Sequence, residues 1–325
     1  MKKFFLYFFS VILVTSLFLT GFWYFGYVNF NRSNTIHSPI PDFLMLSKNN
    51  QVTLLDFWSP QIQLIHGDTG DIADLTAQSV LMYDLTDNKI LYEKDPNVRR
   101  PMASLTKIMT AVIALDSQKP DDNYKVTKPD MVTGDDMGVS TGETYNLEDL
   151  LYGLVLHSGN DAAETLASNY PGGRSAFINA MNNKAKALGM LDTNYTNPSG
   201  LQGDGNQYTT TYDLLIITKY ALEHYPLFAK VVSTENYTIP QTNQHKEIDL
   251  SNETNLLSTY PGVEGVKTGY TPDAGLCLVT YLNYGGHKII GIILNSQNRR
   301  NEMKELLDYS LKTVNVTPPV YNPNG

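Results

Sequence analysis

Ser104 and Lys107 are the two side chains around which the chemistry of this sequence can be organised. Three residues along a helix make nearly one turn, so the Ser104 hydroxyl and the Lys107 amine are expected to share one face. A serine hydroxyl is a poor nucleophile unless a base lies beside it, and a lysine held among apolar residues loses part of its proton affinity. The spacing therefore predicts a serine nucleophile with a lysine base.

The residues around this pair favour a buried helix. Small Ala103 precedes Ser104, apolar residues follow Lys107, and neither glycine nor proline occurs before Pro120. Four residues are weak support by themselves, because the same S-x-x-K pattern can mark the start of an ordinary surface helix. Other motifs have to support the interpretation.

Two further motifs follow in an informative order. Residues 158–160 read S-G-N and residues 267–269 read K-T-G. The order S-x-x-K, S-D-N, K-T-G is typical of penicillin-binding proteins and class A β-lactamases. With the residues that flank the three motifs, roughly residues 75–315 closely resemble the serine D-alanyl-D-alanine carboxypeptidases of low molecular mass.

The resemblance implies an acyl-enzyme mechanism on a peptidoglycan peptide that ends in D-Ala-D-Ala. Ser104 would attack the carbonyl of the penultimate D-alanine, Lys107 would accept its proton, and the backbone N–H groups of Ser104 and Tyr270 would hold the oxyanion. Ser158 would relay a proton to the leaving amine, and Asn160 would hold the Lys107 amine and the substrate amide. β-Lactam antibiotics would be covalent inhibitors.

The third motif is expected to bind the substrate. Lys267 would supply positive potential, Thr268 would bind the terminal carboxylate, and Gly269 would let the strand backbone approach the substrate closely. An arginine recognises a carboxylate better through its planar fork, and this family usually has one near the start of the last helix. Arg299 is the predicted residue, Arg300 is the alternative, and a solvated pair at a helix start is the ordinary interpretation.

Composition excludes several other classes of function. The net charge is −9 and no basic run occurs, which argues against a nucleic-acid partner. The six histidines are scattered and lack a metal-binding spacing, so no metal and no cofactor are expected. The single cysteine, Cys277, cannot form an internal disulfide and is expected to be a small buried residue in a strand.

The N-terminus predicts a membrane anchor. Residues 4–28 carry no charge, and in a helix at about 1.5 Å per residue they exceed the roughly 30 Å hydrocarbon core. Lys2 and Lys3 favour a cytoplasmic N-terminus. A cleaved signal peptide is the alternative, but its apolar region is normally about 7 to 15 residues and ends at an A-x-A-like site, which is missing. We expect a single-pass protein of the cell membrane with an extracytoplasmic catalytic domain.

The remaining sequence predicts one catalytic domain. We expect a transmembrane signal-anchor in residues 1–31, a stalk in 32–74 with short strands at 52–57 and 62–65, the catalytic domain in 75–316 and a short tail in 317–325. Strands near both ends of the domain with helices between them predict an α+β fold. The resemblance specifies a β-lactamase/DD-peptidase-like antiparallel sheet flanked by helices, with a mostly helical insertion. The expected elements are hairpins at 79–93 and 275–294 and helices at 104–115, 147–156, from 161, 174–188, 211–225 and 302–312.

Four alternative functions stay open at this point. A G-x-S-x-G sequence at 138–142 suggests an α/β-hydrolase with Ser140 as nucleophile, but no strand pattern precedes it and no helix opens at the serine. A β-lactamase needs a second carboxylate for fast deacylation, and Glu164 does not lie where one is expected. An inactive penicillin-binding scaffold should have lost a polar motif residue, and none is lost. A DD-endopeptidase that cuts peptidoglycan cross-links fits the same motifs.

Overall fold

The computed structural model describes residues 58–60, 72, 75–201 and 205–321. The expected anchor, most of the stalk and its two short strands lie outside these ranges, so those expectations and the domain boundaries stay predictions. Within the described ranges, no helix has both the length and the apolar character that crossing a membrane requires.

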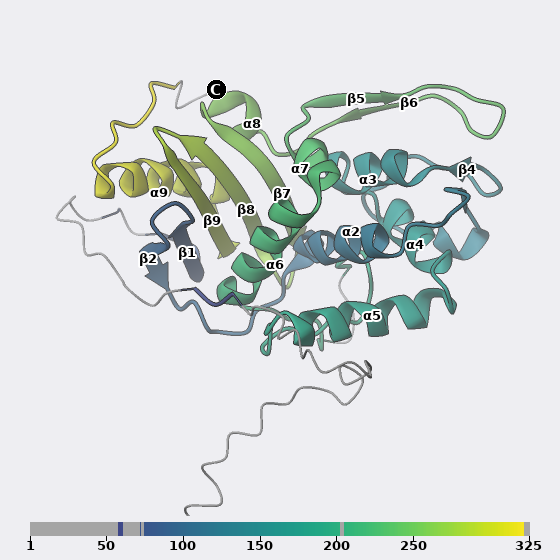
Figure 1. The fold of residues 1–325 in the computed structure, drawn as a ribbon, viewed down its shortest axis with the longest axis horizontal. Helices are drawn as coiled ribbons and strands as arrows, with labels where there is room; N and C mark the ends of the chain where they lie inside the picture. The colour runs from purple at the N-terminus through teal and green to yellow at the C-terminus, as the bar shows by residue number, and fades with distance from the viewer. Residues whose placement is uncertain (1–57, 61–71, 73–74, 202–204, 322–325) are drawn as a thin grey trace, which may run out of the picture. The chain divides into compact units, whose positions relative to one another are not determined.

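Two long apolar runs form the centre of the main sheet. β8 (Gly275–Tyr284) and β9 (His287–Ser296) form the predicted antiparallel hairpin. β1 (Ser79–Asp84) pairs with β9 and carries β2 (Lys89–Lys94) at one edge, whereas β7 (Val263–Thr271) pairs with β8 at the other. The strand order is β2-β1-β9-β8-β7 (Figure 1). The middle strands are covered on both faces, which explains their nearly continuous apolar sequences.

The helices of the described chain agree closely with the sequence pattern. The predicted helices are present within one or two residues at most ends, and Asn146 caps α3 through its side chain, which accepts a hydrogen bond from Asp149 N. The helices are α2 (Thr106–Asp116), α3 (Leu147–Leu156), α4 (Asn160–Ser168), α5 (Gly173–Ala187), α6 (Thr211–His224), α7 (Pro226–Val232), α8 (Leu256–Thr259) and α9 (Arg299–Thr313).

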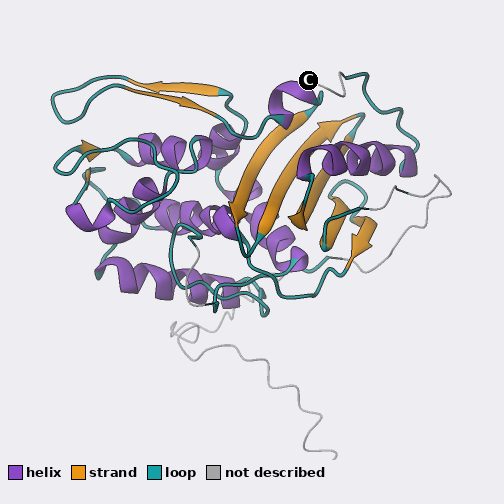
Figure 2. Cartoon of the chain, turned by 180° about the vertical axis from the view of Figure 1, so that it is seen from behind, coloured by secondary structure: helices purple, strands orange, loops and turns teal. Residues whose placement is uncertain are grey.

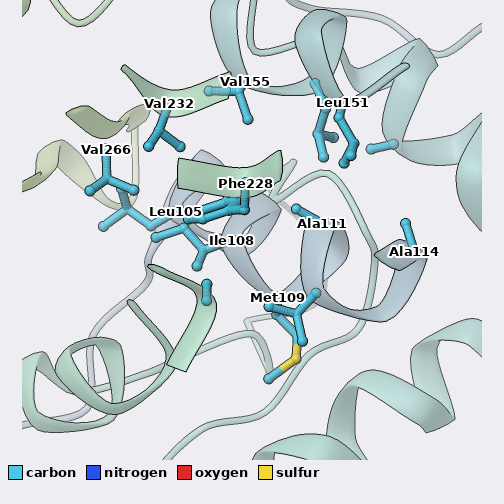
Figure 3. Packing of buried hydrophobic residues seen from close by; sticks show 14 of the residues in the cluster. Leu105, Ile108, Met109, Ala111, Ala114, Leu151, Val155, Phe228, Val232 and Val266 are labelled. Carbon is cyan, nitrogen blue, oxygen red and sulfur yellow. The ribbon is translucent and has the colours of Figure 1, made fainter. Parts of the chain in front are cut away.

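Helix α2 lies in the middle of the helical part of the protein. Its residues from Thr106 to Ala114 are all buried, so the helix is enclosed on every side. Leu105, just before α2, and Ile108 on α2 belong to one buried cluster with Phe228 of α7 and Val266 of β7 (Figure 3). Because α2 has no solvated face, any polar side chain on it needs a partner inside the protein.

Helix α9 covers the opposite face of the sheet (Figure 2). Its Leu306, Leu307 and Leu311 are fully buried, and each such side chain stabilises the fold by about 1.5–3 kcal/mol. Gly291 on β9 allows this close packing, because a Cβ there would lie 2.7 Å from the sulfur of Met303 on α9. Alternate residues of β1 face the two layers, which is the period of two expected for a strand between helices.

Some elements differ from the sequence-based expectation. The first turn of the nucleophile helix is a 3-10 helix, η2 (Ala103–Leu105), and the α-helix begins only at Thr106. The last helix begins at Arg299, three residues before the predicted start. Short strands were also missed: β3 (Tyr124–Lys125), β4 (Thr144–Tyr145), β5 (Asn236–Ile239) and β6 (Ile248–Ser251).

The G-x-S-x-G segment has no nucleophile elbow in the structure. Residues 138–142 lie in a loop after η3 (Lys128–Asp130) and before β4. The Asp161 carboxylate accepts hydrogen bonds from the backbone N–H groups of Met137, Gly138 and Val139, which fixes this loop. Ser140 is exposed, and neither a strand nor a helix adjoins it. The structure therefore agrees with setting the α/β-hydrolase alternative aside.

Candidate active site

The η2 turn presents Ser104 at the edge of the sheet. Ala103 has a positive φ of 48°, and this sharp turn precedes the entry of the chain into α2. The Thr106 hydroxyl donates to the Ala103 carbonyl (2.8 Å), which holds the turn. Opposite the turn lies β7, and a Cβ at Gly269 would be only 3.0 Å from Ser104 N. Gly269 therefore allows the nucleophile turn and the third motif to approach each other. Its predicted close approach to the substrate stays a prediction.

The Lys107 amine lies at the centre of a hydrogen-bonded cluster. Its Nζ is 2.9 Å from Ser104 Oγ, 2.8 Å from Asn160 Oδ1 and 2.7 Å from the Ser199 carbonyl oxygen. The Lys107 side chain is 1% exposed. Burial lowers the pKa of Lys107 well below its usual value, and the positive charge of Lys267 lowers it further. These causes favour the neutral amine that a general base requires.

The second motif is held by the start of α4. Asn160 is the first residue of that helix, and its Nδ2 donates to the Thr133 carbonyl (3.1 Å), which turns Oδ1 toward Lys107. Ser158 lies two residues earlier in the connection from α3, has a positive φ of 54° and is 2% exposed. Lys107 has no hydrogen bond to Ser158 within the described residues. The structure thus joins Ser104, Lys107 and Asn160 directly. The proton-relay role of Ser158, two residues before Asn160, stays a prediction.

A loop that sequence analysis did not assign to the site supplies the third partner of Lys107. The Ser199 carbonyl accepts from Lys107, and the neighbouring Pro198 carbonyl accepts from Thr110 on α2 at 2.6 Å. Gln207 fixes the loop from its other side, since its Oε1 accepts from Asn197 N (3.0 Å) and its Nε2 donates to Thr106 (3.0 Å). Sequence analysis could not have identified this acceptor, because a backbone carbonyl has no residue-type signature.

Strand β7, which carries the third motif, is an edge strand of the sheet. Lys267 is 2% exposed and Thr268 is 5% exposed, whereas the Tyr270 side chain is 61% exposed. Burial lowers the pKa of Lys267 to about 8, a shift that the Glu253 carboxylate opposes and the Arg299 charge increases. Lys267 Nζ donates to the Thr268 carbonyl at 3.1 Å. The motif therefore provides a cation and a hydroxyl close to Ser104.

Arg299 reaches β7 from the start of α9. Its Nη1 donates to the carbonyls of Gly269 (2.6 Å) and Cys277 (3.3 Å). The neighbouring Arg300 has a buried Nε without a hydrogen-bond partner among the described residues. The structure places Arg299, the residue predicted from the sequence, beside the K-T-G strand. Its role toward a substrate stays a prediction.

One group of described side chains has the spacing of possible metal ligands. Asp84, Asp87 and His287 have ligand atoms within 4.8 Å of one another, at the turn after β1 and the start of β9. Asp84 is fully buried, and its carboxylate already pairs with His287 Nδ1 (2.7 Å) and accepts from Thr86 N (2.8 Å). These contacts explain the cluster as a structural hydrogen-bonded pair that joins two turns.

Comparisons with known proteins agree with the geometry. The family model of peptidase S11, D-alanyl-D-alanine carboxypeptidase, matches residues 67–298. The chain therefore belongs to this family of serine-type D-Ala-D-Ala peptidases.

Individual relatives carry three kinds of name: carboxypeptidase, endopeptidase and transpeptidase. The D-alanyl-D-alanine carboxypeptidase DacF of Bacillus subtilis is 32% identical over 76% of this chain, and the match spans 65% of that relative's length. A D-alanyl-D-alanine endopeptidase of Pseudomonas aeruginosa is 35% identical over 63% of this chain and 67% of its own. The crystal structure of a Streptomyces DD-transpeptidase superposes with a TM-score of 0.71 at 30% identity, covering 75% of this chain and all of that one.

The loop geometry generates a first prediction. Gly200 has a φ of +85°, and a Cβ there would lie 2.0 Å from the Ala103 carbonyl oxygen. We expect Gly200→Ala to displace the loop from the nucleophile turn and to reduce covalent labelling by a fluorescent penicillin at least tenfold. Gly189→Ala is the control, because Gly189 has a similar φ of +80° but open space around it. Equal labelling of both variants would contradict the expectation.

Proposed function

We propose that the protein is a D-alanyl-D-alanine carboxypeptidase that acts on peptidoglycan stem peptides through an acyl-enzyme at Ser104. The strongest support is the environment of the Lys107 amine, which lies within hydrogen-bond distance of one hydroxyl and two carbonyl-type oxygens. Family membership supports the reaction class.

The three partners of Lys107 define the direction of proton transfer. A neutral amine has two N–H donors and one lone pair. Asn160 Oδ1 and the Ser199 carbonyl can only accept, so they take the two N–H groups. The lone pair is then left for the Ser104 hydroxyl, which can donate. This arrangement makes Lys107 the base that takes the Ser104 proton as Oγ attacks the substrate carbonyl.

The same groups complete the reaction. The oxyanion formed by the attack is held by the backbone N–H groups of Ser104 and Tyr270, which adjoin the close contact at Gly269. The proton taken by Lys107 passes to the leaving amine with Ser158 as relay, the C–N bond breaks, and D-alanine departs. Water then attacks the acyl-enzyme ester and gives a proton to Lys107. Lys107 passes this proton to Ser104 Oγ as the ester C–O bond breaks, which releases the shortened peptide and restores the enzyme. β-Lactams acylate Ser104 in the same way and act as covalent inhibitors.

Carboxylate recognition distinguishes a carboxypeptidase from other peptidases. Lys267 and Arg299 supply two positive charges and Thr268 supplies a hydroxyl, all beside or on β7. Burial of both cations strengthens their interaction with an anion. These groups support binding of the free carboxylate of the terminal D-alanine.

A DD-endopeptidase acting on cross-links is the second candidate. Relatives named as endopeptidases from Pseudomonas aeruginosa and Escherichia coli are 35% and 34% identical, similar to the carboxypeptidases. A β-lactamase has less support, because the Glu164 carboxylate accepts a hydrogen bond from Arg174 Nε on α5 at 2.6 Å. Glu164 is therefore held toward α5. An inactive scaffold has little support, because Ser104, Lys107 and Asn160 remain hydrogen-bonded together.

We also propose that residues 4–28 anchor the protein in the cell membrane with the catalytic domain outside the cytoplasm. The support is the uncharged run after two lysines. Peptidoglycan lies on that side of the membrane, so this topology brings the proposed active site to its substrate.

Acylation is the direct test of the assigned nucleophile. Ser104→Ala removes the attacking oxygen and is expected to abolish covalent labelling by a fluorescent penicillin. Lys107→Ala is expected to lose labelling nearly as completely, because base and nucleophile act as a unit. Ser140→Ala, at the exposed serine of the G-x-S-x-G segment, is the matched control and should label normally. Labelling of the Ser104 variant would rule out the assignment.

Carboxylate recognition gives a separate prediction for Arg299. Arg299→Ala should cost about 1.5–3 kcal/mol of transition-state stabilisation on a pentapeptide ending in D-Ala-D-Ala, the range for a charged hydrogen bond. The loss should be much smaller on the same peptide with an amidated C-terminus, measured as kcat/KM for each substrate. Equal losses on both peptides would remove Arg299 from the carboxylate site and shift weight toward the endopeptidase candidate.

The membrane anchor is tested by topology. A reporter fused after residue 325 should be active only outside the cytoplasm, and the mature protein should keep its original N-terminus. N-terminal sequencing that finds a processed end near residues 25–35 would replace the anchor by a cleaved signal peptide and leave the proposed enzyme activity unaffected.

A further inference from the structure

Glu253 is an exposed carboxylate at the third motif for which the mechanism above has no role. It lies between β6 and α8, and its backbone N–H donates to the Leu156 carbonyl at the end of α3 (3.2 Å). Asn252 fixes the same segment, since its Nδ2 donates to the Thr234 carbonyl (2.9 Å) and its Oδ1 accepts from Thr254 N (2.9 Å). The backbone on both sides of Glu253 is therefore held in place.

The Glu253 side chain points to the hydroxyl that the substrate needs. Thr268 Oγ1 donates to Glu253 Oε2 at 3.5 Å. A threonine hydroxyl has one proton to donate, so it cannot hydrogen-bond fully to Glu253 and to a substrate carboxylate at once. A substrate with a free terminal carboxylate has to replace Glu253 as the acceptor of this proton.

The charge of Glu253 acts on the same cations that would attract the substrate. Burial lowers the pKa of Lys107, Lys267 and Arg299, and in each case the Glu253 carboxylate counteracts this by raising the pKa. Its negative charge thus lies within electrostatic range of all three groups. A second carboxylate bound at Lys267 and Arg299 is repelled by it.

We propose that Glu253 is a specificity-determining residue that weakens binding of a free terminal carboxylate and so reduces the preference of the site for carboxylate over carboxamide. A carboxamide avoids the repulsion, because its oxygen can accept from Thr268 while its NH2 group donates to Glu253. Arg299 and Glu253 then act in opposite directions on the same substrate group. This inference rests on the proposed D-Ala-D-Ala peptidase function. It concerns whether the C-terminal residue that the enzyme releases carries a free carboxylate or a carboxamide.

The test compares two substrates on the full-length protein in detergent. Each is a pentapeptide ending in D-Ala-D-Ala, one with a free C-terminal carboxylate and one with a carboxamide, and kcat/KM is measured for release of D-alanine or D-alaninamide. Glu253→Gln keeps the shape of the side chain and removes its charge. We expect the carboxylate-to-carboxamide ratio of kcat/KM to rise about three- to tenfold, mainly through a lower KM for the carboxylate substrate.

The conditions and controls separate this effect from others. Measurement at pH 6.5 keeps Lys267 charged in the unchanged protein, where its pKa is about 8. Because the Glu253 charge raises that pKa, both proteins are also compared at pH 5.5, so that a loss of the Lys267 charge in the variant is not mistaken for the proposed effect. Glu247→Gln removes an exposed carboxylate just before β6 and should leave the ratio unchanged. If Glu253→Gln fails to fold, as judged by loss of penicillin labelling, Glu253→Ala is measured with the same expected rise.

The outcomes distinguish the inference from the function on which it rests. An active Glu253 variant whose ratio is unchanged or lower would overturn the inference alone. Equal loss of activity on both substrates with retained labelling would also overturn it, because Glu253 would then support the reaction in general. Absence of both labelling and hydrolysis in the unchanged protein would overturn the proposed function and the inference together.

Discussion

The burial of one amine group determines how the active site is assembled. Lys107 projects from a helix without a solvated face, and a buried polar group without partners costs about 1–3 kcal/mol for each lost hydrogen bond. Three hydrogen-bond partners offset this cost, and they come from three different segments: the η2 turn, the start of α4 and the loop at residues 196–201. The hydrogen bonds that the buried amine requires therefore form only when these three segments come together, and the same contacts assemble the site.

Close backbone contacts make this assembly possible. The η2 turn is bordered by β7 on one side and by the 196–201 loop on the other, and glycines stand at both contacts. A side chain at Gly269 would press on Ser104 N, and one at Gly200 would overlap the Ala103 carbonyl. The sheet supports β7 through β8 and β9, which in turn pack on α9. The rigid sheet thus sets the distance between the nucleophile and the proposed carboxylate-binding groups.

The sequence predicted the parts of the protein whose signal lies in residue types and periodicity. The order of the three motifs led to Ser104 and Lys107, and the apolar runs at 275–282 and 288–294 predicted the central hairpin. The short strands were missed because two to four residues cannot show a period. The start of α2 was placed early because the positive φ of Ala103 has no signature in a non-glycine residue.

Other parts of the site lie beyond sequence reasoning because they depend on tertiary contact. Glu253 lies fourteen residues before Lys267 in a polar segment whose sequence is typical of an ordinary loop. Only the fold brings its carboxylate to Thr268. Arg299 and Arg300 are adjacent and chemically identical, so residue type alone could not choose between them. The family resemblance selected Arg299, and of these two described residues the structure shows only Arg299 hydrogen-bonded to the backbone of β7.

The acceptor provided by residue 199 is a backbone carbonyl, and this affects how the enzyme can change over evolution. A substitution at Ser199 can disturb the loop, since its hydroxyl bonds Asn197 and Leu201 N, but it cannot delete the carbonyl oxygen that holds Lys107. Asn160, by contrast, loses its contribution with any change of side chain that removes the amide oxygen. Part of the basicity of Lys107 is therefore encoded in the course of the main chain, which tolerates sequence drift as long as the loop keeps its path.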